Sequence, residues 1–88
     1  MPLKKHFATI TILVKDRQSN VARVNKLLTD NGHLIVARLG VNIEPKCIKY
    51  CTGMITLATK GSKEEIVELT KKLDKLYGIV AKASIMTE

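Results

Sequence analysis

The chain has 88 residues, of which 45% are hydrophobic, and 15 Lys and Arg against 8 Asp and Glu give a formal net charge of +7. This length predicts one domain over residues 1–88, and the apolar content argues against disorder. No apolar run approaches roughly 18 residues, so no membrane-spanning helix is predicted, and no secretion signal is visible. Two cysteines are too few for a disulfide framework, so we expect a cytoplasmic protein with reduced thiols.

The first half of the chain predicts a strand, a helix and a second strand. Apolar and β-branched residues alternate over 6–14, which is typical of a strand with one buried face. A polar break over 15–18 follows, and Ser19 is a suitable N-cap for a helix that runs to about Asn31. Gly32 then offers the left-handed residue that ends such a helix.

Residues 34–43 predict the second strand. One of its faces is entirely apolar, with Ile35, Ala37, Leu39, Val41 and Ile43; the other includes Arg38, Gly40 and Asn42. A turn is expected over 44–46 because Pro45 stands between two charged residues. The third strand is expected to begin at Cys47 or Ile48 and to end at Thr59.

A second helix and a last strand complete the pattern. Ser62 followed by Glu65 is a capping box at the start of the helix, and Gly78 is placed to end it. Apolar residues at helical spacing predict its buried face: Ile66, Leu69, Leu73 and Leu76. Residues 79–86 then alternate as a fourth strand.

The order of elements predicts an α+β fold of the ferredoxin-like βαββαβ class. Its antiparallel sheet has the strand order 4-1-3-2, with both helices on one face. The uncovered face is expected to carry Thr9, Thr11, Leu13, Arg38, Thr52, Met54, Thr56, Lys82, Ser84 and Met86. This mixture favours a face buried in a homo-oligomer, while a Thr-rich solvent face is the alternative.

The residue types with catalytic or metal-binding chemistry are few. No nucleophile, base and orienting group fall together, so neither an enzyme nor a cofactor is predicted. Along a strand, four residues from Cys47 to Cys51 would span about 13 Å, so the two cysteines can share a metal only if Cys47 lies in the turn. His6 and His33 are expected at the other end of the sheet. A metal-sensing site with Cys47 and Cys51 is therefore expected only if it is shared between subunits.

The basic charge raises nucleic-acid binding as a further alternative. RNA-recognition modules share this strand order, but they stack bases on several aromatic residues of the first and third strands. Here those strands are expected to offer only Phe7 and Tyr50. Twelve of the fifteen basic residues are Lys, which is also typical of a simple solvated surface.

Residues 14–28 and 31–35 resemble the ACT regulatory domain. The shared pattern is a strand, an Asp16-Arg17 loop, a capped helix ending in Leu27-Leu28, and Asn31-Gly32 before the second strand. The resemblance implies that the first loop, often with a partner's strand, binds amino acids or other small effectors. The family's Pro-Gly after Asp-Arg is replaced here by Gln18-Ser19.

A closer resemblance covers nearly the whole chain. Residues 24–28, 35–41 and 66–82 are similar to a small family assigned as regulators of iron-only hydrogenase systems. These are ACT-like proteins, similar in fold to the effector domain of the nickel-responsive repressor. The histidines that match that repressor's metal site are missing, so nickel sensing is not expected.

Together these observations predict a non-catalytic regulatory module that acts as a dimer or tetramer. The expected effector pocket joins the first loop to the second strand of another subunit, with Asp16, Arg17, Ser19, Asn20, Arg38 and Gly40. Arg38 offers a fork for a carboxylate or phosphate, or else an interface salt bridge, and Gly40 permits close approach. No helix-turn-helix or ribbon arm is predicted before residue 6, so we expect any transcriptional role to need a partner protein that supplies the DNA contact.

Overall fold

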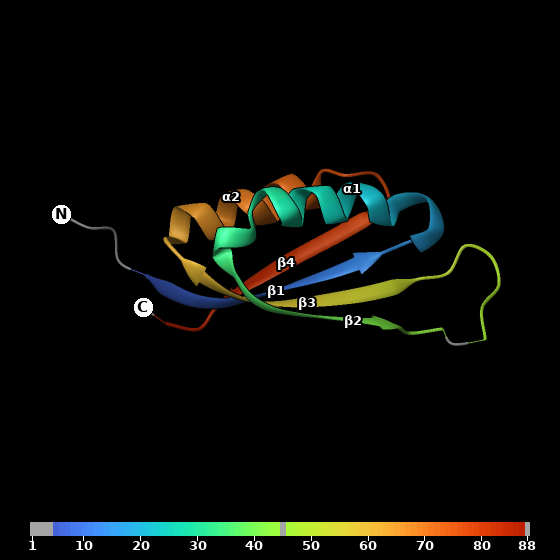
Figure 1. Ribbon diagram of the computed structural model, residues 1–88, viewed down its shortest axis with the longest axis horizontal. Helices are drawn as coiled ribbons and strands as arrows, with labels where there is room; N and C mark the ends of the chain where they lie inside the picture. Colours follow the sequence, from blue (N-terminus) through green and yellow to red (C-terminus); the bar gives the residue numbers. More distant parts are fainter. Residues whose placement is uncertain (1–4, 45, 88) are drawn as a thin grey trace.

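The computed structural model describes residues 5–44 and 46–87. Their secondary structure is β1 (His6–Val14), α1 (Arg17–Asp30), the short 3-10 helix η1 (Gly32–Leu34), β2 (Ile35–Asn42), β3 (Gly53–Gly61), α2 (Lys63–Asp74) and β4 (Ile79–Ile85). The strands of this region form one antiparallel sheet in the order β2-β3-β1-β4 (Figure 1). The predicted α+β fold and strand order are confirmed.

Both helices cover the same face of the sheet (Figure 1). Alternate residues of β1 are buried beneath them: Ala8, Ile10, Ile12 and Val14. The helices contribute Val24 and Leu28 from α1 and Ile66, Leu69 and Leu73 from α2. Each large aliphatic side chain buried in this way contributes about 1.5–3 kcal/mol to folding. No helix in the described part of the chain is long and apolar enough to cross a membrane.

A β-bulge changes which face of β2 meets the helices. Ile35 pairs with Thr59 of β3, but the register shifts before Ala37, which pairs with Ala58. Since side chains alternate along a strand, one extra residue moves all that follow to the other face. Arg38 is opposite the buried Leu57 and so lies on the helix side, not on the open face as predicted. Leu39 and Val41 lie on the open face instead.

The segment between β2 and β3 is a loop rather than the start of a strand. β3 begins at Gly53, so the prediction of a strand from Cys47 or Ile48 was wrong. The Cα atoms of Cys47 and Cys51 are 5.7 Å apart and a disulfide joins their sulfur atoms, which corrects the expectation of separate, reduced thiols. The amide of Cys47 donates to the carbonyl of Glu44 (2.9 Å); Pro45 itself lies outside the described residues.

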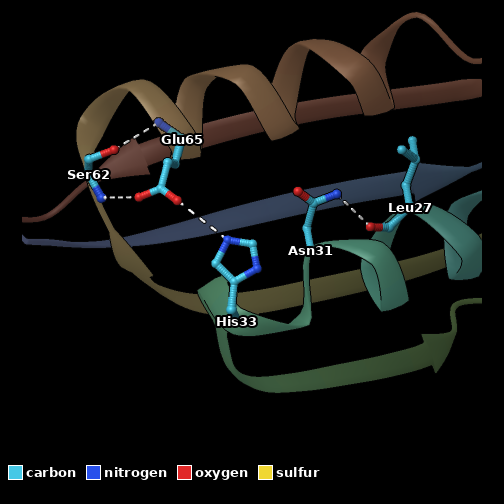
Figure 2. Close-up of polar contacts among 5 residues, drawn as sticks. All are labelled: Leu27, Asn31, His33, Ser62 and Glu65. Atoms are coloured by element: carbon cyan, nitrogen blue, oxygen red, sulfur yellow. Dashed lines mark hydrogen bonds and ion pairs between the residues drawn. The ribbon is translucent and has the colours of Figure 1, made fainter.

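The helix ends agree with the sequence only in part. α1 begins at Arg17 after Asp16, whose φ of 47° is left-handed and whose side chain makes no cap bond, so Ser19 is not the N-cap. After α1, Gly32 opens η1 and is not left-handed. The helix ends instead at its C-cap Asn31, whose side chain donates to the Leu27 carbonyl (2.8 Å; Figure 2). Gly78 does adopt a left-handed φ of 76°, but it does not end the helix as predicted, because α2 already ends at Asp74 with Lys75 as its C-cap.

The predicted capping box of α2 is present (Figure 2). The Ser62 hydroxyl accepts from the amide of Glu65 at 3.2 Å, and the Glu65 carboxylate accepts from the amide of Ser62 at 3.1 Å. His33 Nε2 lies 3.4 Å from the same carboxylate. The hydrogen bonds from the Ser62 backbone and side chain, and then the contact with His33, lower the pKa of Glu65 below its ordinary value.

Candidate functional site

A groove of about 200 Å³ runs between the first turns of α1 and the strands β2 and β3, on the helix side of the sheet. Its walls are mostly apolar, with two arginines among them. The lining residues are Val14, Arg17, Val21, Arg38, Gly40, Val41, Asn42, Gly53, Met54 and Ile55. None of these residues is acidic, so the groove has two cationic side chains and no carboxylate of its own to neutralise them.

Arg17 forms the α1 wall of the groove. Its backbone amide donates to the carbonyl of Cys51 at 2.7 Å, which fixes the start of the helix against the end of the loop before β3. Its side chain crosses over Gly53, where an added Cβ would lie only 2.8 Å from Arg17 Cδ. The Arg17 Nε atom is buried and has no hydrogen-bond partner in the structure. An unpaired buried donor of this kind is costly unless something binds it.

Arg38 and Gly40 form the opposite wall, on β2. Arg38 Nη2 donates to the side-chain oxygen of Asn25 on α1 at 3.0 Å, and the residue is otherwise exposed. A Cβ added at Gly40 would find nothing nearer than Ile55 Cγ1, at 3.9 Å, so this part of the groove is open space. A planar guanidinium beside open space can take up a carboxylate or phosphate through two parallel hydrogen bonds.

Asp16 and Asn20 do not line this groove. They border a separate hollow of about 470 Å³ beside the start of α1. Its other lining residues are Lys15, Tyr50, Tyr77 and Gly78. Asn20 is buried and holds local structure, because its Nδ2 donates to the Lys15 carbonyl at 2.7 Å and its Oδ1 accepts from Arg23. Ser19 is exposed, and its amide donates to the Asp16 carbonyl at 3.0 Å.

The structure therefore brings Arg17, Arg38 and Gly40 together within one chain, whereas the sequence assigned the two β2 residues to another subunit. The bulge in β2 is the reason, because it places Arg38 and Gly40 on the helix side. Sequence reasoning missed Gly53. A glycine at the start of a β-rich segment is a signal for close approach of another group, and here that group is the Arg17 side chain.

The residues expected to serve a metal or nucleic acid do not converge. Among residues 5–44 and 46–87, no three His, Cys, Asp or Glu side chains are grouped to hold a metal ion. Cys47 and Cys51 are not thiolates while the disulfide joins them, so they offer no metal ligand. Phe7 lies in β1 near Lys60, and Tyr50 lies in the loop at the opposite end of the sheet.

Comparison with known proteins identifies the family. A family model with the description "TM1266-like: Iron-only hydrogenase system regulator, putative" matches residues 6–83. The solved structure of the uncharacterized protein TM1266 from Thermotoga maritima is 27% identical, with a TM-score of 0.84 over 96% of this chain and 100% of that one. No curated protein matches the sequence.

Two further structures share the fold at low identity. An unknown protein from Galdieria sulphuraria is 11% identical, with a TM-score of 0.70 over 99% of this chain and 53% of that one. The YXEP protein of Bacillus subtilis, a dinuclear metal-binding peptidase of the M20 family, is 13% identical, with a TM-score of 0.55 over 98% of this chain and 27% of that one. From the family match, the chain belongs to the TM1266-like family, whose description is that of an iron-only hydrogenase system regulator.

Proposed function

We propose that this protein is a non-catalytic regulatory module of an iron-only hydrogenase system, and that it binds a small anionic effector in the groove between α1 and β2. The observation that carries the proposal is the pair of arginines, Arg17 and Arg38, on facing walls without a carboxylate between them. The unpaired Arg17 Nε supports it, since no acceptor among the described residues is bonded to this atom of the guanidinium. The family description supports the regulatory class.

The size and lining of the groove limit the effector. A volume of about 200 Å³ is below the roughly 300 Å³ at which drug-sized sites begin, so the ligand is small. Val14, Val21 and Ile55 supply apolar contacts beside the arginines. The effector we propose has one carboxylate or phosphate head for the guanidinium groups and a short apolar body for the valines.

Self-association is the second part of the proposal. On the open face of the sheet, Leu39 is 66% and Val41 46% exposed, and the half-buried Met54 of β3 and Leu13 of β1 lie beside Val41 on the same face. We propose that a second copy covers this face, which gives a dimer or tetramer that acts in the cytoplasm. If the module acts on transcription, a partner protein supplies the DNA contact.

A native mass spectrum of freshly purified protein tests both parts. A dimer or tetramer with a stoichiometric extra mass is expected, and that mass identifies the effector. A bare monomer would contradict the self-association, and titration with a small anion would then decide whether the groove binds one.

The groove is tested by calorimetric titration with isovalerate, a small carboxylate with a branched apolar tail. We expect Arg38→Ala to weaken binding about tenfold or more, because a charge-assisted pair is lost. The control is Lys26→Ala, which removes one positive charge from the exposed face of α1, where Lys26 pairs with Asp30 at 3.4 Å. The alcohol with the same tail, isoamyl alcohol, should not bind. Equal affinity of Arg38→Ala and the parent protein would remove Arg38 from the site.

A further inference from the structure

The loop of residues 43–44 and 46–52, here called the cysteine loop, is joined directly to the start of α1. The Gln18 side chain donates from Nε2 to Cys51 Sγ (3.3 Å) and accepts at Oε1 from the Cys51 amide (3.3 Å). The Arg17 amide donates to the Cys51 carbonyl at 2.7 Å. Cys51 therefore holds the first two residues of α1, one of which forms a wall of the groove.

The two sulfur-bearing residues differ in exposure. Cys51 is 1% exposed, whereas Cys47 is half-buried and lies between the exposed Lys46 and Lys49. A thiolate from outside therefore reaches Cys47 first, and the lysines attract its negative charge. Cys51 is then the leaving group, and the Gln18 amide that already contacts its sulfur stabilises the thiolate formed.

The conformation of the cysteine loop is not one that the chain prefers by itself. Tyr50, directly before Cys51, has a φ of 55°, which is left-handed and unfavourable for a residue with a bulky side chain. Its side chain is 75% exposed, so packing does not hold it there. The disulfide and the contacts of Cys51 with α1 hold this backbone instead, and opening the disulfide removes one of these constraints.

We propose that Cys47 and Cys51 form a reversible thiol–disulfide site whose redox state sets the position of Arg17, and so the affinity of the groove for its anion. The last step rests on the proposed function. The redox partner we propose is a dithiol, which supplies the two electrons and two protons that reduction of the site requires. In a reducing compartment, a protein disulfide is typically transient and acts in catalysis or redox sensing.

The exchange balances in two steps. A thiolate of the dithiol attacks Cys47 Sγ, the Cys47–Cys51 bond breaks, and its electron pair goes to Cys51 Sγ, which takes a proton. The second thiol of the reductant, as a thiolate, then attacks the reductant sulfur that is bonded to Cys47 in the mixed disulfide. Cys47 leaves as a thiolate and takes a proton. The protein ends with two thiols and the reductant with one disulfide.

The expected consequence is weaker anion binding by the reduced protein. In the oxidised form the Cys51 carbonyl is fixed under the amide of Arg17, and the Arg17 side chain lies against Gly53, two residues further along. Reduction frees the loop and so loosens both supports of Arg17. Because coupling between two sites is reciprocal, an anion bound in the groove also makes the disulfide harder to reduce.

The test compares the full chain after oxidation with diamide and after reduction with dithiothreitol, by thiol titration and residue-resolved amide exchange. We expect no titratable thiol after oxidation and both cysteines free after reduction. The Arg17 amide should exchange about tenfold faster or more in the reduced form, because it loses a fixed acceptor. The amide of Glu65, in the capping box at the other end of the sheet, is the internal control and should not change.

The Cys47→Ser variant should behave as the reduced protein in either reagent. If that variant does not fold, the wild-type chain in the two reagents still decides the question. Thiols that remain free under diamide would overturn the redox site. A change confined to the cysteine loop, with Arg17 unaffected, would overturn its coupling to α1.

Isovalerate titration of the two forms separates this proposal from the one on which it rests. About fivefold weaker binding to the reduced form is expected, at the lower end of typical couplings between sites. Equal isovalerate affinity of the two forms would overturn the claim that the redox state of the disulfide sets the affinity of the groove. Absence of binding to either form would overturn the effector groove and with it the last step, while the Arg17 amide would still report whether the disulfide controls the start of α1.

Discussion

The two ends of the sheet differ in how their polar groups are satisfied. At the end that contains η1 and the start of α2, here called the cap end, Ser62 is 2% exposed and both of its hydrogen bonds to Glu65 are made (Figure 2). His33 lies against the same carboxylate, and Leu34 packs against Gly61 so closely that a Cβ there would be 2.6 Å from Leu34 Cδ2. The polar groups of the cap end are paired and its apolar contacts are close, so this end stabilises the fold.

The opposite end, here called the groove end, holds the start of α1 and the cysteine loop. Asp16 and Tyr50 both lie at this end, and they are the non-glycine residues of the described chain that have a positive φ. Arg17 Nε is buried without a partner, and Ile48 is 88% exposed. Strained backbone and unsatisfied donors cluster at functional sites, so the contrast supports the proposal that the effector binds at the groove end.

A pair of Gly→Ala changes gives the largest expected difference between the ends. Gly61→Ala should destabilise the protein by about 1–3 kcal/mol, because the new methyl group collides with the buried Leu34. Gly40→Ala should leave stability unchanged or raise it by up to about 1 kcal/mol, since its neighbour is 3.9 Å away and alanine restricts the unfolded chain. Urea unfolding of both variants measures this.

The same pair also tests the groove. The methyl group of Gly40→Ala fills part of the space that the effector would occupy, so isovalerate binding should weaken although the fold is intact. A Gly40→Ala protein as unstable as Gly61→Ala would contradict the contrast between the ends. Unchanged isovalerate affinity of a stable Gly40→Ala protein would show that the ligand does not bind beside Gly40.

The two helix N-caps give the next largest difference. Ser62→Ala should lower the free energy of unfolding by about 1 kcal/mol, because the amide of Glu65 loses its acceptor. Asp16→Gly should leave the free energy of unfolding unchanged or raise it by up to about 1 kcal/mol. The Asp16 side chain makes no cap bond, and glycine adopts the left-handed φ of this position without strain. Thermal or urea unfolding separates the two. A loss of stability in Asp16→Gly would show that the aspartate side chain stabilises α1 after all.

The cap end was the more predictable of the two from sequence. Ser62 and Glu65 stand at the spacing of a capping box, which depends only on residues three apart in the chain. The spacing of Ile66, Leu69 and Leu73 likewise predicted the buried face of α2. Local signals of this kind need no knowledge of distant partners, and together they were enough to give the order of strands and helices.

The groove end depended on signals that are not local. The bulge after Ile35 moves Arg38 to the helix side, and no residue in β2 marks it, because every position there is compatible with either face. The contacts of Cys51 with Gln18 join residues 33 apart in the chain. Arg17 and Arg38 were therefore named from the sequence, but their meeting in a single chain could not be predicted.

The smallest expected effect is a pH dependence confined to the cap end. The Ser62 hydrogen bonds lower the pKa of Glu65 in the folded protein below its ordinary value near 4.5, so the charged carboxylate stabilises the fold above that pH. This contribution should be lost as the pH falls from about 4.5 through the lowered pKa. The measurement is the difference in unfolding free energy between the parent protein and Glu65→Gln, by urea at pH 7 and at pH 3. We expect the difference to shrink in acid, because protonated Glu65 then resembles the glutamine. A difference that is the same at both pH values would show that the charge of Glu65 does not stabilise the capping box.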